Sequence, residues 1–152
     1  MIRIAAVCVA TIAVAACGTG HHAGSGTTRP PAATVTTVAG THRLTTASSC
    51  WTAPAAGGTV GGCGDTGPPA TIPGLATIRV RVGETIVVHL DFTPTGRVDA
   101  ALAGHRLRLP SASTLRLHVT RTGLLRIDAS RGRDQVEYLA RLITGPLPAG
   151  AA

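Results

Sequence analysis

The chain has no lysine and no asparagine, and its only methionine is the first residue. Without lysine there is no Schiff-base amine, no P-loop lysine and no serine–lysine nucleophile pair. Without asparagine there is no N-glycosylation sequon and no Cys-His-Asn triad. Without an internal methionine there is no thioether ligand for a blue-copper site. These absences exclude several classes of enzyme and of redox protein.

Aromatic residues are scarce too, since Trp51, Phe92 and Tyr138 are the full set. The chain is nevertheless basic, with 14 arginines against 7 acidic residues and a formal net charge of +7. Proteins that bind single-stranded nucleic acid stack bases on aromatic side chains, which this chain almost lacks. We therefore expect no nucleic-acid partner. The charge instead favours attraction to anionic lipid headgroups, to acidic envelope polymers or to an envelope protein.

The N-terminus contains the most informative pattern. Arg3 is followed by a largely apolar, uncharged run from Ile4 to Ala16, the length of a signal-peptide core and too short to span a bilayer. The run ends in Val14-Ala15-Ala16-Cys17. This tetrad resembles the lipobox of bacterial lipoproteins, in which the cysteine receives diacylglycerol, the leader is removed and the new amino end is often acylated. The resemblance implies a signal peptide at residues 1–16 and a lipid, such as palmitate, on Cys17.

The lipobox resemblance also implies a location. Two or more acyl chains anchor a protein stably without a membrane span, so the chain is expected at the extracytoplasmic side of the cell membrane. A signal peptide without lipid, cut after Ala16 or a later small residue, is the alternative. The excess of alanine, glycine, threonine and proline, with arginine as the sole long basic residue, is typical of a GC-rich genome. The resemblance is therefore to lipoproteins of the actinobacterial type.

Two cysteines remain beyond Cys17, namely Cys50 and Cys63. In an oxidising compartment an even pair predicts a disulfide. A closed loop of about fourteen residues contributes about 3 kcal/mol in the chain-entropy model. A metal pair is the rival interpretation, although no Cys-x-x-Cys spacing supports it.

Composition divides the chain into segments. We expect residues 17–40 to consist of the acylated cysteine and a flexible tether rich in glycine, threonine and proline. A segment of this composition buries too little apolar surface to offset the entropy of ordering. Residues 41–74 predict an irregular, disulfide-bearing segment with short strands near 43–47 and 58–61. Residues 146–152 predict a disordered tail.

Residues 75–145 alternate between apolar and polar positions with a period of two. Ile78, Val80 and Val82 alternate with arginines, and similar runs recur at 8–12-residue spacing between glycine and proline turns. This pattern predicts an all-β domain, either an Ig-like β-sandwich or a small barrel. Residues 135–143 fit both a helical and a strand periodicity, and the all-β context favours a strand.

One stretch of this region carries a second resemblance. Residues 80–90, VRVGETIVVHL, followed by Thr93-Pro94-Thr95-Gly96, are similar to the strand–turn–strand–loop run of chagasin-like cysteine-protease inhibitors. Those proteins are Ig-like sandwiches that insert an Asn-Pro-Thr-Thr-Gly-Tyr loop into the protease cleft. Here threonine replaces the asparagine, one threonine is missing and Arg97 replaces the aromatic residue. The resemblance implies an Ig-like fold and, as an alternative function, protease inhibition through an exposed Pro94 loop.

Outward positions of the predicted strands carry many of the arginines. Long arginine stems can cover sheet surface while the guanidinium groups stay in water. The acidic residues fall mostly in or beside turns. We interpret six arginines as a possible anion-binding face: Arg79, Arg81, Arg106, Arg108, Arg116 and Arg126.

Catalytic and metal sites are weakly supported. A metal-binding envelope protein would need two of His89, His105 and His118 side by side. Ser130, His118 and Asp128 are the residue types of a hydrolytic triad, but no Gly-x-Ser-x-Gly turn holds the serine. We therefore predict no catalytic residue, no metal and no cofactor. The expected role is non-enzymatic binding or scaffolding in the cell envelope.

Overall fold

The structure is a computed structural model and describes residues 29–145. The predicted leader at residues 1–16, the predicted lipid on Cys17, the first part of the predicted tether and the predicted tail at residues 146–152 lie outside the described residues. Those four statements stay predictions.

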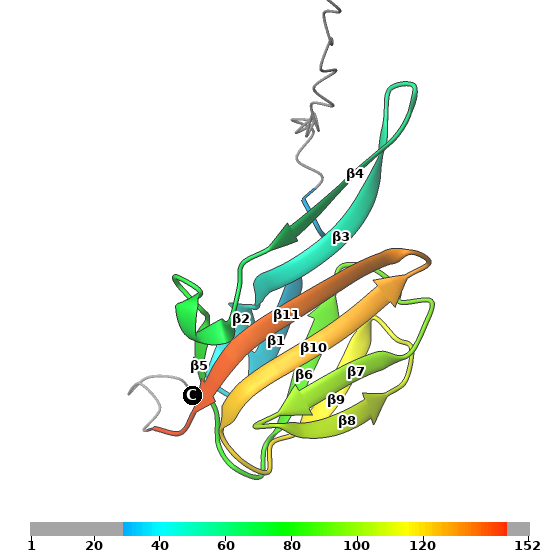
Figure 1. Ribbon diagram of the computed structural model, residues 1–152. Helices are drawn as coiled ribbons and strands as arrows, with labels where there is room; N and C mark the ends of the chain where they lie inside the picture. Colours follow the sequence, from blue (N-terminus) through cyan, green and yellow to red (C-terminus); the bar gives the residue numbers. More distant parts are fainter. Residues whose placement is uncertain (1–28, 146–152) are drawn as a thin grey trace, which may run out of the picture.

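Within residues 29–145 the strands form two sheets (Figure 1). Sheet A has the order β2-β1-β6-β9, and its strands are Gly40–Arg43 (β2), Ala33–Thr37 (β1), Thr85–Leu90 (β6) and Thr114–His118 (β9). Sheet B has the order β4-β3-β11-β10-β7-β8, and its strands are Gly58–Asp65 (β4), Thr45–Ala55 (β3), Asp134–Ile143 (β11), Gly123–Arg131 (β10), Val98–Leu102 (β7) and His105–Leu109 (β8). The short β5, Thr77–Arg79, pairs in parallel with β11, and a 3₁₀ turn spans Pro69–Thr71.

The core lies between the two sheets, because the inward residues of both belong to one apolar cluster. Sheet A contributes Val35, Ile86, Val88, Leu115 and Leu117; sheet B contributes Val98, Ala100, Leu125, Ile127 and Tyr138. Each fully buried aliphatic side chain contributes about 1.5–3 kcal/mol relative to an exposed one. The prediction of an all-β sandwich is confirmed, and residues 135–143 form a strand as expected.

The prediction of a tether through residue 40 is wrong in its last part. Residues 33–37 form β1, which lies between β2 and β6 in sheet A, and both Ala33 and Val35 are fully buried. Small side chains made this segment look like a linker. Its alternation of Ala33, Val35 and Thr37 with outward threonines nevertheless has the period of a strand.

The prediction of an irregular segment at residues 41–74 is wrong for most of its length, because the two short strands expected near 43–47 and 58–61 are the first parts of longer strands that run to Ala55 and Asp65. Strands β3 and β4 form a long hairpin that extends beyond the rest of the sandwich (Figure 1). The predicted disulfide is confirmed: Cys50 and Cys63 lie directly opposite each other in the two strands and are bonded. We call the part of this hairpin beyond the disulfide, residues 51–62, the arm.

The base of the arm is attached to the sandwich by polar and aromatic contacts. Trp51 is 5% exposed, packs edge-on against Phe92 with ring centroids 5.0 Å apart, and has Arg131 Cζ 4.6 Å from its ring centre. The Asp134 carboxylate accepts hydrogen bonds from the Thr52 backbone N–H at 3.0 Å and from its hydroxyl at 2.7 Å. The hydroxyl bond is the largest cause that lowers the pKa of Asp134. The arm therefore leaves the sandwich in a defined direction.

The segment that enters the fold is also fixed. The Tyr138 hydroxyl donates a hydrogen bond of 2.7 Å to the carbonyl of Pro31, just before β1. Tyr138 is fully buried, and this burial raises the pKa of its phenol well above the usual value. No helix in the described part of the chain is long and apolar enough to cross a membrane.

Candidate functional site

The six arginines of the predicted anion-binding face are all exposed, but they do not share one face. Arg79 and Arg81 lie in and just after β5, and Arg116 projects outward from β9 in sheet A. The remaining three, Arg106, Arg108 and Arg126, lie on the outer face of sheet B. The prediction of a single basic face is therefore wrong. Outward positions could be read from the alternation, whereas the assignment of each strand to a sheet could not.

The outer face of sheet B also carries more acid than expected. Asp128 in β10 lies opposite Asp99 in β7 on one side and opposite Glu137 in β11 on the other. The same cross-strand row continues through Ser48 in β3 to Asp65 in β4. These carboxylates lie on strands, not mostly in turns as the sequence suggested. Directly opposed like charges such as Asp99 and Asp128 are unfavourable unless a cation lies between or beside them.

Arg126 supplies that cation. Its Nε lies 2.9 Å from Asp128 Oδ2 and 2.9 Å from Glu137 Oε1, and the Ser48 hydroxyl donates to the other Glu137 oxygen at 3.2 Å. The hydrogen bond to Asp128 is the largest cause that raises the pKa of Arg126, and the charges of both carboxylates add to it. An arginine already paired with two carboxylates is not available to an external anion.

A hollow of about 600 Å³ lies over this row, and we call it the polar trough. Serines, Gln135 and the disulfide line part of it. Its charged lining residues are Asp65, Asp99, Asp128, Glu137, Arg97 and Arg126. Because carboxylates outnumber guanidinium groups, the polar trough does not favour the acidic partner that the sequence analysis expected.

A second hollow of about 290 Å³ has the opposite character, and we call it the basic cleft. It lies between β8, the edge strand of sheet B, and β9, the edge strand of sheet A. Its polar lining consists of His105, Arg108, Arg116, His118 and Thr120. Its apolar lining consists of Leu102, Leu107, Leu109 and Leu117. Among the described residues no carboxylate lines it, although Asp99 lies opposite Arg108 in the strand register.

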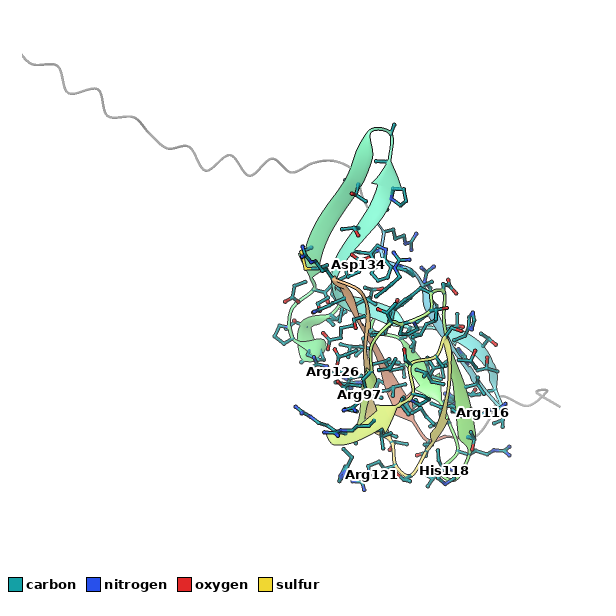
Figure 2. The ribbon with its side chains drawn as sticks, turned by 90° about the vertical axis from the view of Figure 1, so that its right-hand side faces the viewer. Arg97, Arg116, His118, Arg121, Arg126 and Asp134 are labelled. Atoms are coloured by element: carbon teal, nitrogen blue, oxygen red, sulfur yellow. A yellow bond between two sulfur atoms is a disulfide. The ribbon has the colours of Figure 1, made fainter. Side chains whose placement is uncertain are left out.

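Arg121 adds a further cation beside the basic cleft. Its guanidinium donates a hydrogen bond to His105 Nε2, which must accept because a guanidinium has no acceptor atom. Figure 2 shows His118 and Arg121 at the end of the sandwich away from the arm, whereas Arg116 lies higher on the right-hand side and Arg97 and Arg126 lie nearer the middle. The basic cleft is thus lined by donors and positive charge, and Asp99, which lies opposite Arg108 in the strand register but does not line the cleft, is the nearby carboxylate.

The histidine and triad arrangements considered from the sequence are not assembled. His118 lies opposite Thr85 and His89 lies opposite Thr114, so the two histidines are not cross-strand neighbours. In residues 29–145 no three His, Cys, Asp or Glu side chains gather in a way that could hold a metal ion. Ser130 and Asp128 line the polar trough, whereas His118 lines the basic cleft.

The loop that resembles the inhibitory loop of chagasin-like proteins is tied to the sandwich. Pro94 is buried, and its carbonyl accepts a hydrogen bond of 2.7 Å from the Ser111 hydroxyl. Thr95 donates its N–H to the Ser130 carbonyl at 3.0 Å, and its hydroxyl accepts from the Gly132 N–H at 2.8 Å. The exposed proline that insertion into a protease cleft would require is therefore not present.

Sequence reasoning named Arg108 and Arg116 but grouped them with the wrong partners. The sequence pattern indicates His105 and His118 as candidate metal ligands and His118 also as a triad residue, and it does not single out Arg121. The one available signal was the outward position of Arg116 and His118 on the same strand. Comparison with protein-family models, with curated proteins and with solved structures finds no match to this chain.

Proposed function

We propose that this chain is an extracytoplasmic lipoprotein, anchored through Cys17, whose sandwich binds an anionic partner at the basic cleft without catalysing a reaction. The observation that carries the proposal is the carboxylate-free lining of Arg108, Arg116, His105 and His118. Guanidinium groups recognise phosphate and carboxylate oxygens in bidentate geometry, and they remain charged at any physiological pH. In the polar trough, by contrast, carboxylates outnumber guanidinium groups, and Arg126 is already paired with two of them.

Vesicle sedimentation tests the binding half of the proposal. The chain from Gly18 to Ala152 lacks Cys17 and keeps every described residue, so association cannot arise from an attached lipid. We expect it to sediment with vesicles of anionic phospholipid at low salt and to be released at high salt, because the Debye length falls from about 10 Å at 0.1 M to about 3 Å at 1 M. Zwitterionic vesicles should leave it in the supernatant. Equal sedimentation with both kinds of vesicle would contradict the proposal.

Detergent partition tests the anchoring half. In an actinobacterial host the full-length chain should enter the detergent phase, and the Cys17→Ala variant should stay in the aqueous phase because it has no thiol to alkylate. The Cys8→Ala variant is the matched control, since Cys8 lies in the leader that the lipobox resemblance removes. Recovery of wild type and Cys17→Ala in the same phase would exclude a lipid on Cys17.

A further inference from the structure

The basic cleft has an apolar floor as well as a cationic rim. Leu102 and Leu117 are 4% and 3% exposed, while Leu107 and Leu109 are only half-buried and pack against the edge of the main core. Half-buried leucines between two strands present apolar surface that folding has not covered. A ligand that covers this apolar surface removes it from water, and the hydrophobic effect then stabilises the complex.

The cleft exists because the sandwich is not closed at this side. Strand β8 pairs only with β7, and β9 pairs only with β6, in the part of the chain that the structure describes. No backbone ladder therefore joins β8 to β9, and the inward leucines of both strands border the gap between the sheets. A slender apolar group can enter here without breaking a backbone hydrogen bond.

The charged side chains at the rim favour a ligand whose headgroup is negatively charged. Arg108 projects outward from β8 and Arg116 outward from β9, and both side chains line the cleft, one from each sheet. His105 and His118 add nitrogen atoms at the same entrance. An anionic headgroup is attracted to this rim, whereas a cationic headgroup on the same chain is repelled.

The size of the cleft limits the apolar part of the ligand. A volume of about 290 Å³ is at the lower end of the range of about 300–1,000 Å³ that is usual for ligand pockets. It accommodates one alkyl chain more readily than the two chains of a phospholipid.

We infer that the basic cleft binds a free long-chain alkyl carboxylate, with the carboxylate between Arg108 and Arg116 and the chain against the leucines of β8 and β9. This inference rests on the proposed function and names its ligand class. A single amphiphile bound in this way places its alkyl chain inside the sandwich, whereas a membrane surface would contact only the charged side chains at the rim.

Calorimetric titration of the chain from Gly18 to Ala152 tests the inference, with each ligand kept below its micelle concentration. Octanoate, decanoate and dodecanoate should bind with affinities that rise about 4-fold per methylene, which corresponds to about 0.8 kcal/mol. Dodecyltrimethylammonium, with the same chain and the opposite charge, should bind at least about 100-fold more weakly than dodecanoate.

Substitutions test whether the ligand binds in the cleft. Leu107→Phe fills the space between the strands, so the affinity of the carboxylates should no longer depend on their chain length. Leu75→Phe is a change of the same size at a half-buried leucine outside the cleft, and it should preserve this dependence. Arg116→Gln should weaken binding while keeping the dependence on chain length. Magnetisation transfer from the dodecanoate chain to the methyl groups of Leu107 and Leu109 should be seen in wild type even if Leu107→Phe folds poorly.

The two proposals fail in different ways. Sedimentation with anionic vesicles combined with equal affinity for octanoate and dodecanoate would overturn the inference and leave the proposed function intact. Equal affinity for the anionic and the cationic dodecyl ligands would also overturn it. The absence of both vesicle association and carboxylate binding would overturn both proposals.

Discussion

The Arg108→Glu, Arg116→Glu double variant is expected to bind anionic vesicles about 1,000-fold more weakly than wild type. Each arginine near an anionic surface contributes about 1 kcal/mol, and each introduced glutamate costs a similar amount, so the two reversals together remove about 4 kcal/mol. The Arg108→Gln, Arg116→Gln variant removes the charges without reversing them and should lose about 30-fold. Sedimentation at fixed low salt over a range of lipid concentrations measures both losses.

The matched control reverses two exposed arginines elsewhere. Arg43 lies in β2, at the edge of sheet A opposite β9, and Arg133 lies in the turn between β10 and β11. The Arg43→Glu, Arg133→Glu variant has the same net charge as the cleft double variant. It should keep most of the affinity, because screening weakens charges that lie more than a Debye length from the contact. An equal loss in both double variants would show that total charge, not the basic cleft, determines binding.

Trp51→Ala is expected to lower the free energy of unfolding by about 3–5 kcal/mol, the usual cost of truncating a buried tryptophan. The substitution removes the edge-on contact with Phe92 and the ring beneath Arg131, and it leaves a gap where the arm joins the sandwich. A typical domain has only about 5–15 kcal/mol of stability, so the loss is a large part of the total. Urea unfolding followed by circular dichroism measures it, since the variant has no tryptophan to report by fluorescence.

Val82→Ala is the comparison for that experiment. Val82 is 57% exposed, so its truncation removes two methyl groups without creating a cavity and should change stability by less than about 0.5 kcal/mol. Trp51→Phe, which keeps an aromatic ring beside Phe92, should lie between the two. If Trp51→Ala unfolded at the same urea concentration as Val82→Ala, the base of the arm would not be part of the cooperative unit.

The strands that the sequence predicted well are those with a strong period of two. Ile86, Val88 and Leu90 are buried in β6, and Leu115 and Leu117 are buried in β9, as their alternation requires. Each such strand has large aliphatic residues on one face and polar ones on the other, which makes its register unambiguous. The sandwich class follows from several strands of this kind.

The strands that the sequence missed, or predicted too short, contain small residues. In β4, glycines at positions 58, 61, 62 and 64 leave almost no hydrophobic pattern, and the strand is defined by its backbone pairing with β3 and by the Cys50–Cys63 disulfide. In β1, alanine and threonine have the correct period but too little bulk to distinguish a strand from a linker. Backbone pairing of small residues is a tertiary property that composition does not show.

The candidate site was predictable only residue by residue. The outward positions of Arg108 and Arg116 follow from alternation along β8 and β9. That these two strands are the neighbouring edges of different sheets follows from strand order, which a single sequence does not contain. For the same reason the pairing of Arg126 with Asp128 and Glu137, which removes it from the predicted face, became visible only in the cross-strand register.

The most direct test of the central claim locates the bound anion on the domain. Amide chemical shifts of the ¹⁵N-labelled chain from Gly18 to Ala152 can be followed during titration with a short-chain anionic phospholipid below its micelle concentration. The basic cleft predicts concentration-dependent shifts that centre on Leu107, Arg108, Arg116 and Leu117 and disappear at high salt. Shifts that centre instead on Asp128 and Glu137 in the polar trough, or no shifts at all, would contradict the account.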